Sequence, residues 1–537
     1  MSPELYSLIV SRVVVAWSVA AAVVVAVLLA IRALAPGALF ALAVRVVAEV
    51  RTSIRDARQW AATSEAAVLG AITIAGALLR GRYLMQPVRT DEAATFLYYA
   101  FHPLAVGISV YASPNNHLLH TLLVHLVYGV TGDVPWALRL PSYAAGVLIV
   151  PATYWVARRF ATPSAGLIAA ALAAASPALV DYSALARGYS MMTLAFLAAM
   201  AIARRAVRDD AILPWLAIAL VLAAGLWTVP LMTYAAGVIA AWIAVHLATI
   251  ASSDRAASRR EWLRFGGSLA LAAGLTFIAY LPVLVVSGAG ALFTNRYLAA
   301  QAARSILFDS ADGVLATWGF IVEGLARPLE VMLALAALAG TVITLRDTSR
   351  SDTRVPFWIG VPLFVAPALA LFRVVPYHRT WLFLVPVILI LAGIGLEATV
   401  SSLIPARAFV WIALTLCLIG VALAWRSDVV YYSNETGSYR DAAGTTAFLK
   451  ASLRPDDCVV TTVPSDVILM YEFARQRVSQ RHFGASSGCR RAFMVVNTSA
   501  GQDLAWVLRE THVAPATPAH LVRRSESGAV YAIDLKR

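Results

Sequence analysis

RTDE at residues 89–92, SPNNHLLH at 113–120 and RLPS at 139–142 are the polar strings of one segment that is flanked by long apolar runs. Asp91 and Glu92 stand side by side in the first string. Two adjacent carboxylates beside a membrane are costly to keep there unless they serve a purpose. The apolar runs on either side of this segment decide the fold class.

The composition predicts a membrane protein. The chain has 537 residues, of which 60% are hydrophobic and 14% are charged, and its mean hydropathy is +0.74. A soluble protein carries roughly 25% charged residues. The net charge of +13 could suit nucleic acid. The basic residues, nearly all arginine, instead lie in short loops between apolar runs, as expected for cytoplasmic loops. We therefore expect membrane lipids and no nucleic acid as partners.

Many apolar runs reach the roughly 18–20 residues needed to cross a bilayer as a helix. With arginine-bearing loops placed in the cytoplasm, the sequence predicts an all-α polytopic protein of about twelve transmembrane helices. The predicted spans are 8–31, 65–81, 139–157, 164–181, 189–203, 211–227, 230–250, 265–287, 329–345, 355–373, 380–398 and 406–425. A secretory signal peptide is the competing interpretation of the first run.

The histidine-bearing stretch 116–130 is short for a span. The loop charges place both Arg82 and Arg139 outside, so an even number of crossings must separate them. We therefore predict that residues 82–138 form one long external loop that contains juxtamembrane helices.

Three regions follow from this reading of the chain. Residues 1–64 should form an extra transmembrane helix and a cytoplasmic amphipathic helix on the inner leaflet. Residues 65–425 form the membrane core, and residues 426–537 form a small extracytoplasmic α/β domain. The expected elements of that domain are strands at Cys458–Val463, Ala492–Asn497 and Gly528–Asp534 and a helix at Ser465–Arg477. Cys458 and Cys489 could pair outside the cytoplasm, or each could be a separate buried thiol.

Asp91 is the candidate base and Glu92 its companion, although a solvated loop acid would look the same in the sequence. Transfer of a group from a phosphate ester to a hydroxyl needs a carboxylate to accept the proton. It also needs cations for the phosphate. Arg139, Arg187 and Arg379 each begin an inbound helix, so they are candidate phosphate ligands, with headgroup anchoring as the alternative.

Other polar residues on the same side of the membrane are candidate substrate contacts: Asn116, His117, His120, Tyr189 and His378. His117 and His120 are three residues apart on one helical face, so a divalent metal is conceivable. Interfacial packing or hydrogen bonding to substrate is the favoured interpretation, and we assign no metal ligand and no cofactor.

The order of RTDE, SPNNHLL, RLPS and SALARGY (183–189) resembles glycosyltransferase family 39 and its bacterial relatives of the aminoarabinose-transferase and lipopolysaccharide galacturonosyltransferase type. These are C-type, polyprenyl-phosphate-sugar-dependent enzymes. The resemblance covers about residues 65–210 and continues loosely to Arg379 and Pro386. It implies a multi-helix membrane fold and an inverting sugar transfer, on the extracytoplasmic face of the cell membrane, to a glycan, lipid or protein acceptor.

By the same resemblance, Asp91 matches the catalytic acid of the family, and Arg187 and Arg379 match positions near the donor phosphate. The chain departs from the family at residues 114–117, where many relatives carry a Pro-Pro or Lys-Pro-Pro element. An arginine or His117 would then replace the phosphate-binding lysine of those relatives.

Two other classes of function compete with a transferase. A lipid-linked sugar transporter or flippase would place charges at mid-membrane depth, whereas the charges here cluster at one face. A non-catalytic scaffold would act through the terminal domain and would not need the Asp91-Glu92 pair. No glycine-rich nucleotide-binding loop is found, which disfavours an ATP-driven pump.

Overall fold

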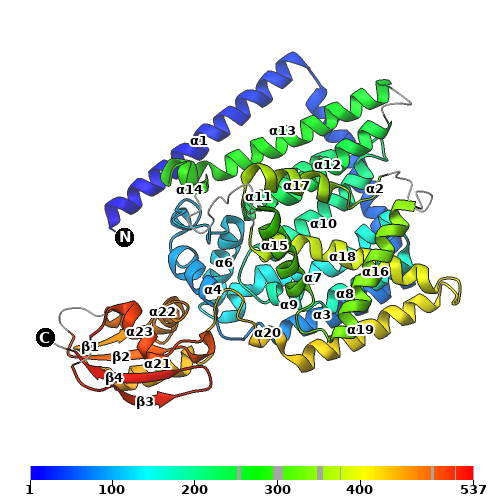
Figure 1. Ribbon diagram of the computed structural model, residues 1–537. Helices are drawn as coiled ribbons and strands as arrows, with labels where there is room; N and C mark the ends of the chain where they lie inside the picture. Colours follow the sequence, from blue (N-terminus) through cyan, green and yellow to red (C-terminus); the bar gives the residue numbers. More distant parts are fainter. Residues whose placement is uncertain are drawn as a thin grey trace. The chain divides into compact units, whose positions relative to one another are not determined.

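The computed structural model describes residues 2–250, 255–293, 306–346, 355–374, 376–484, 489–514 and 516–535 (Figure 1). The chain divides into two compact units that interleave along the sequence. Unit 1 consists of Met1–Arg82, Ile108–His120 and Pro141–Val430, and unit 2 of Tyr83–Gly107, Thr121–Leu140 and Tyr431–Arg537.

Helices coincide with every one of the twelve predicted spans. They are α1 (Pro3–Leu34), α3 (Ser64–Arg82), α7 (Pro135–Phe160), α8 (Pro163–Ala175), α9 (Pro177–Ser183), α10 (Tyr189–Ala206), α11 (Leu213–Thr228), α12 (Met232–Ile250), α13 (Arg255–Val286), α16 (Arg327–Arg346), α17 (Gly360–Phe372), α18 (Val385–Val400) and α19 (Ala408–Ser427). Within the described residues, eight helices are long and apolar enough to cross a membrane, or nine if α8 and α9 form one bent span. Helices α11 and α17 are apolar but shorter. The prediction of a helical, multi-pass membrane protein is confirmed.

The remaining helices are short or lie beside the spans. They are α2 (Ala38–Ala61), α4 (Thr90–Thr95), the π-helix η1 (Phe96–Ala100), α5 (Leu104–Gly107), α6 (Leu118–Thr131), α14 (Gly290–Phe293), α15 (Ile306–Ile321), the 3₁₀-helix η2 (His378–Leu384) and α20 (Val429–Tyr432). The predicted amphipathic helix within 32–64 is α2, which has no buried residue. The first predicted loop contains α4, η1, α5 and α6, so its expected helices are present.

A break between α8 and α9 is held by a buried arginine of α3. The two helices meet at 59°, and Pro177 has no N–H to offer the carbonyl of Ala173 four residues earlier. Arg80 donates to the carbonyls of Ala173 (3.0 Å) and Ala174 (2.9 Å) and to Oγ of Ser183 (3.1 Å). Backbone groups inside a membrane must be satisfied by protein, so Arg80 lets the chain turn here.

Unit 2 contains a four-stranded sheet in the order β1-β2-β4-β3. Its strands are β1 (Asp457–Val460), β2 (Arg491–Val496), β3 (His520–Arg524) and β4 (Ala529–Asp534). The first two strands run parallel, and β4 is antiparallel to both β2 and β3. Three strands lie where the sequence predicts them, whereas β3 was not predicted, because it is an edge strand whose side chains are almost all exposed.

Successive side chains of β2 pack into hydrophobic clusters on opposite faces of the sheet. Phe493 and Val495 pack in one cluster with residues of α21 (Ala442–Ser452) and α22 (Ser465–Arg475). Met494 and Val496 pack in another with Val507 of α23 (Leu504–Thr511). Successive residues of a strand point to opposite faces, so helices cover the sheet on both sides (Figure 1). Two 3₁₀ turns complete the unit: η3 (Gln480–His482) and η4 (Thr498–Ala500).

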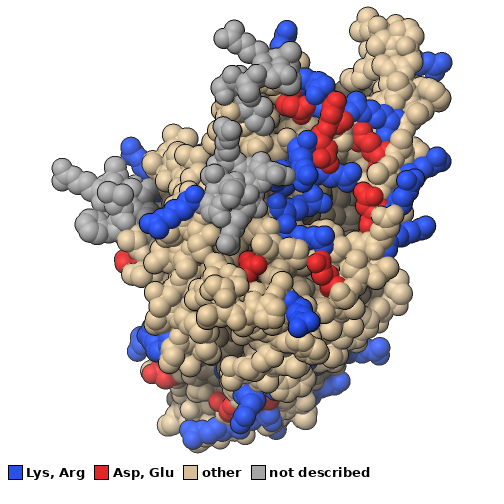
Figure 2. All heavy atoms as spheres, turned by 90° about the vertical axis from the view of Figure 1, so that its right-hand side faces the viewer, with Lys and Arg blue, Asp and Glu red and all other residues tan. Residues whose placement is uncertain are grey.

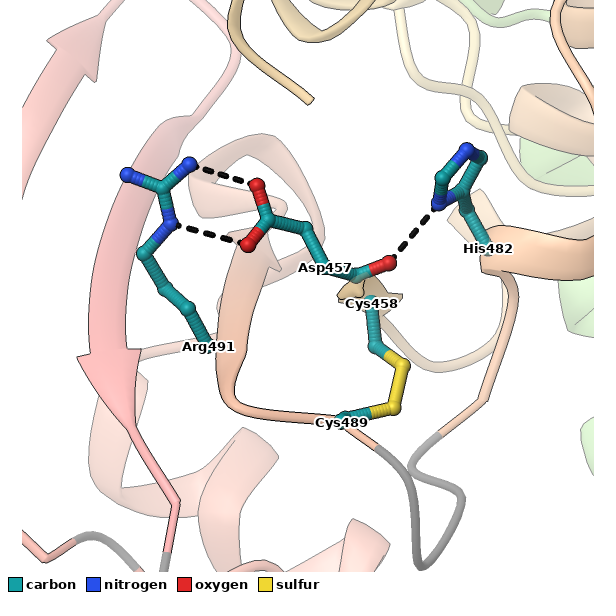
Figure 3. Close-up of a disulfide and its surroundings, with 5 residues drawn as sticks. All are labelled: Asp457, Cys458, His482, Cys489 and Arg491. Carbon is teal, nitrogen blue, oxygen red and sulfur yellow. Dashed lines mark hydrogen bonds and ion pairs between the residues drawn. A yellow bond between two sulfur atoms is a disulfide. The ribbon is translucent and has the colours of Figure 1, made fainter. Parts of the chain in front are cut away.

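Cys458 and Cys489 form a disulfide between β1 and the chain entering β2 (Figure 3). Their Cα atoms are 5.9 Å apart and the residues are 31 apart in sequence, so of the two interpretations left open above, pairing holds. Beside the disulfide, Asp457 pairs with Arg491 across the two parallel strands (Figure 3).

Replacing Cys458 with serine should destabilise the sheet of unit 2 by about 2–4 kcal/mol, because the open loop regains chain entropy in the unfolded state. The measurement is thermal unfolding of the purified protein followed by near-UV circular dichroism. The buried free thiol Cys417 provides the control: Cys417→Ser should leave the transition of the sheet in place. An equal shift in both variants would contradict the prediction.

Candidate active site

Asp91 lies in the first turn of α4, in unit 2, and its side chain is half-buried. The preceding residue, Thr90, donates from its N–H to the carbonyl of Gly437 (3.1 Å) and from its hydroxyl to the carbonyl of Pro464 (2.8 Å). A carboxylate at a helix N-terminus is stabilised by the positive end of the helix dipole. The helix start is thus fixed by the terminal domain, and Asp91 has a defined position in it.

Glu92 is buried and forms a bidentate ion pair with Arg139 of α7. Arg139 donates from Nε to Oε1 (2.8 Å) and from Nη2 to Oε2 (2.7 Å), and both side chains are 0% exposed. The same guanidinium donates to the carbonyls of Leu84 (2.9 Å), Gln86 (2.7 Å) and Pro87 (3.0 Å). All five N–H groups of Arg139 are therefore engaged.

This arrangement favours positioning roles for Glu92 and Arg139. Oε2 of Glu92 also accepts from the N–H of Arg89 (2.9 Å), which caps α4 one residue before Thr90. Arg139 was a candidate phosphate ligand. Its N–H groups instead bind backbone carbonyls of a loop, where no helix or strand supplies their hydrogen bonds. We interpret the pair as the clamp that fixes the backbone around Asp91.

Arg187 occupies the loop between α9 and α10 in unit 1 and is 3% exposed. Its Nη1 donates to the carbonyl oxygen (2.8 Å) and the side-chain oxygen of Asn115. Its own carbonyl accepts from the hydroxyl of Ser142 (2.7 Å), and this hydroxyl in turn lies 2.9 Å from Nε2 of His120. Because the Ser142 proton is donated to Arg187, His120 must donate to Ser142. Residues of two polar strings, 113–120 and 139–142, thus bind the guanidinium and the backbone carbonyl of Arg187.

His117 is buried beside Arg187 and is neutral. Its Nδ1 accepts from the N–H of Gly188 (2.8 Å), which places the ring proton on Nε2. Burial, and after it the guanidinium of Arg187, holds the pKa of His117 well below its usual range. A Cβ on Gly188 would lie 2.5 Å from a methyl carbon of Thr228 and 2.9 Å from Nδ1 of His117. The ring of Tyr189 packs edge-on against His117 at 5.1 Å.

Arg379 belongs to η2 in unit 1, and its charge is one of the causes that lower the pKa of His117. Its guanidinium lies over the ring of Tyr377 at 4.7 Å. The neighbouring His378 packs against Phe320 at 4.9 Å. Arg379 is partly exposed.

The structure thus gathers the predicted residues into two groups. Unit 2 holds Asp91, Glu92 and Arg139, and unit 1 holds Asn116, His117, His120, Arg187, Tyr189, His378 and Arg379. Asn116 is a loop residue, and its Nδ2 donates to the carbonyl of Val110 (2.9 Å). Asn115 and Ser142 were not predicted as site residues, although both stand in the polar strings at 113–120 and 139–142.

The two histidines do not form a metal site in the described parts of the chain. His117 is bonded to Gly188 and His120 to Ser142. Across those same residues, no three histidine, cysteine, aspartate or glutamate side chains are grouped so that they could hold a metal ion.

A largely apolar cavity of about 490 Å³ lies among the spanning helices of unit 1. It is lined mainly by α8, α16, α18 and α19 and by the chain between α15 and α16. Leucine and alanine dominate its wall, and Arg426 and Ser427 at the end of α19 supply polar atoms. Such a cavity suits a hydrocarbon chain that ends in a polar group.

Comparisons with known proteins give one family match and several solved structures of similar fold. Residues 118–285 match the family model of dolichyl-phosphate-mannose-protein mannosyltransferase. The crystal structure of ArnT from Cupriavidus metallidurans in the apo state aligns with 13% identity and a TM-score of 0.54, covering 88% of this chain and 98% of ArnT. The form of ArnT bound to undecaprenyl phosphate aligns with 14% identity and a TM-score of 0.53 over the same shares.

A third solved structure is more distant. The oligosaccharyltransferase AglB from Archaeoglobus fulgidus, in complex with an inhibitory peptide and a dolichol-phosphate, has 11% identity and a TM-score of 0.47. The alignment covers 79% of this chain and 69% of AglB. No curated protein sequence matches the chain.

The chain has the fold of the C-type membrane glycosyltransferases, as the ArnT structures show. With the family match over residues 118–285, it is a membrane glycosyltransferase. The sequence's prediction of the fold and of the enzyme class is confirmed.

Proposed function

We propose that this enzyme transfers a sugar, with inversion, from a polyprenyl-phosphate-linked donor to an acceptor outside the cytoplasm. The observation that carries the proposal is the Arg187 loop, because it fixes a buried cation next to a neutral His117, whose pKa the charge of Arg379 also lowers. Arginine recognises phosphate oxygens with its planar fork of N–H groups. A loop that holds such a fork in one orientation is suited to a phosphate that leaves during the reaction.

The proposed step is a single displacement at the sugar C1. Asp91 accepts the proton of the acceptor hydroxyl, the acceptor oxygen bonds to C1, and the bond from C1 to the phosphate oxygen breaks. The electron pair leaves with the polyprenyl phosphate, whose charge Arg187 and Arg379 stabilise. Attack opposite the leaving group inverts C1, and no general acid is required because the phosphate is already a good leaving group.

The apolar cavity provides the other half of donor recognition. We assign it to part of the polyprenyl chain, because it lies among spanning helices and its wall is apolar. The ArnT structure with undecaprenyl phosphate supports this class of donor, since the two chains share a fold. The disulfide of the terminal domain supports a reaction on the extracytoplasmic side.

The test is an assay for release of the lipid carrier. Purified full-length protein in proteoliposomes is incubated with a panel of labelled polyprenyl-phosphate sugars, and free polyprenyl phosphate is separated by thin-layer chromatography. We expect release with at least one sugar and in proportion to the acceptor present. Movement of intact donor across the bilayer without any release would instead indicate a flippase.

Replacing Arg379 with alanine should raise the KM for the donor about tenfold to a hundredfold, since a hydrogen bond to a charged group contributes about 1.5–3 kcal/mol. Arg187→Lys should act in the same direction, because lysine keeps the charge but loses the fork. Steady-state kinetics at saturating acceptor gives both constants.

The matched control is Arg327→Ala, since Arg327 also begins a helix and its side chain is 90% exposed. This variant should behave as the wild type. An unchanged donor KM in Arg379→Ala would remove Arg379 from the phosphate site.

A further inference from the structure

A second cavity of unit 1, of about 640 Å³, has a wall rich in arginine. It lies where α2 meets the last turns of α7 and α10. Its lining residues are Ser53, Asp56, Ala57, Trp155, Arg158, Arg159, Arg204, Arg205, Arg208 and Asp209. Figure 2 shows basic side chains gathered on this face of the molecule, with a few acidic ones among them.

Among the described residues, the lining of this cavity carries more positive than negative charge. Five arginines line it against two aspartates. Arg205 pairs with Asp209 (3.2 Å), and Arg158 pairs with Glu65 outside the lining (2.7 Å). Even with Glu65 counted, the arginines outnumber the carboxylates. A recess lined by one sign of charge concentrates ions of the opposite sign.

Arg159 adds an independent observation. Its Nε is buried and, within the residues that the structure describes, has no hydrogen-bond partner. A buried unsatisfied donor requires an explanation, such as a bound group. The indole of Trp155 lies beside it, with the guanidinium of Arg159 5.9 Å from the ring centroid and that of Arg158 5.5 Å away. The wall therefore combines an N–H group that has no partner among the described residues with the apolar surface of an indole ring.

Arginines at the cytoplasmic ends of spans usually act as topology signals, and these would be expected to face water. Here the arginines from two helices and the following loop converge on one recess, and Arg204 is only 5% exposed. The helix α2 forms one side of the recess, and Ser53 of α2 accepts from Nη1 of Arg205 (2.9 Å). A topology signal does not need this convergence.

We infer that this cavity binds a phosphate group, at the opposite end of α10 from Arg187. Helix α10 has 18 residues, which span roughly 27 Å, so the cavity is separate from the proposed catalytic site. Its charge and its donors suit a phosphate ester, and Trp155 suits the apolar part of the same ligand. The phosphate could belong to the headgroup of a phospholipid or to a soluble molecule, and the experiment separates these sources.

The test uses the purified full-length protein in a neutral detergent. It is titrated with dihexanoyl phosphatidylglycerol, with inorganic phosphate and with dioctanoylglycerol, which has no phosphate, and binding is measured by microscale thermophoresis. The variants are Arg159→Gln and Ser53→Glu. The control is Arg55→Gln, which removes a charge from an exposed position of α2 that does not line the cavity.

We expect phosphatidylglycerol to bind and dioctanoylglycerol not to bind. Arg159→Gln should weaken binding about tenfold, the loss of one charge-assisted hydrogen bond, and Arg55→Gln should not change it. Binding of inorganic phosphate with the same dependence on Arg159 would support a soluble source, and binding of the lipid alone would support a headgroup. Equal affinity in Arg159→Gln and wild type, or an equal loss in Arg55→Gln, would overturn the inference.

Ser53→Glu keeps the test decisive if Arg159→Gln fails to fold. It leaves every arginine in place and adds a carboxylate to the wall from a surface helix. Size-exclusion chromatography and thermal unfolding verify its fold. Unchanged phosphate and lipid binding in this folded variant would also overturn the inference.

Discussion

Asp91→Asn should lower the rate of sugar transfer by about a hundredfold to ten-thousandfold, the contribution typical of a positioned general base. The amide has the size of the carboxylate but cannot accept the proton of the acceptor hydroxyl. The KM for the donor should change little, because the proposed donor contacts come from Arg187 and Arg379. Single-turnover release of labelled sugar in proteoliposomes measures the chemical step directly.

The control for this variant is Asp441→Asn in the same unit. Asp441 is also a half-buried aspartate at the start of a helix, but it pairs with Arg523 (3.0 Å). It should retain transfer. A variant Asp91→Asn that folds and transfers at the rate of the wild type would exclude Asp91 as the base.

Arg139→Met should destabilise the protein by about 3–5 kcal/mol, the cost of leaving one partner of a buried ion pair without the other. Glu92 would remain buried with its charge, and the carbonyls of Leu84, Gln86 and Pro87 would lose their donors. Thermal unfolding should show the loss of stability.

The double variant Glu92→Gln/Arg139→Met should recover part of the lost stability, because the stranded charge is then removed. The control is the half-exposed pair of Arg82 and Asp428 (3.1 Å), where Arg82→Met should cost no more than about 1 kcal/mol. If Arg139 instead binds the donor phosphate, Arg139→Met should fold normally and raise the donor KM. The two roles therefore predict different results.

The fold was predictable because its signal is long and repetitive. Each span is an apolar run, and the arginine-bearing loops between the runs indicate the direction in which each span crosses the membrane. The bend between α8 and α9 was not predicted, since α3 and α8 lie far apart in sequence and the role of Arg80 depends on their contact. The strand β3 was missed because its exposed residues lack the alternation that marks a half-buried strand.

The candidate site was predictable in its residue types and less so in their roles. Charge and position selected Arg139 and Arg187 equally, as cations at the start of inbound helices. The path of the neighbouring backbone gives the two arginines different hydrogen-bond partners. Residues 84–87 present carbonyls to Arg139, whereas Asn115 binds Arg187. Such paths depend on loop conformation, for which a single sequence carries little signal.

Arg80 has a consequence for how arginines in such chains are counted. It lies in a span and is fully buried. Its role is neither to signal topology nor to bind a ligand, because its N–H groups donate to backbone carbonyls at the bend of a neighbouring helix. Pro177 and Arg80 therefore form one coupled unit, although they stand on different helices. A designer who straightened the helix by replacing the proline would leave a guanidinium without its acceptors in the apolar interior, so the two positions should be changed together or not at all.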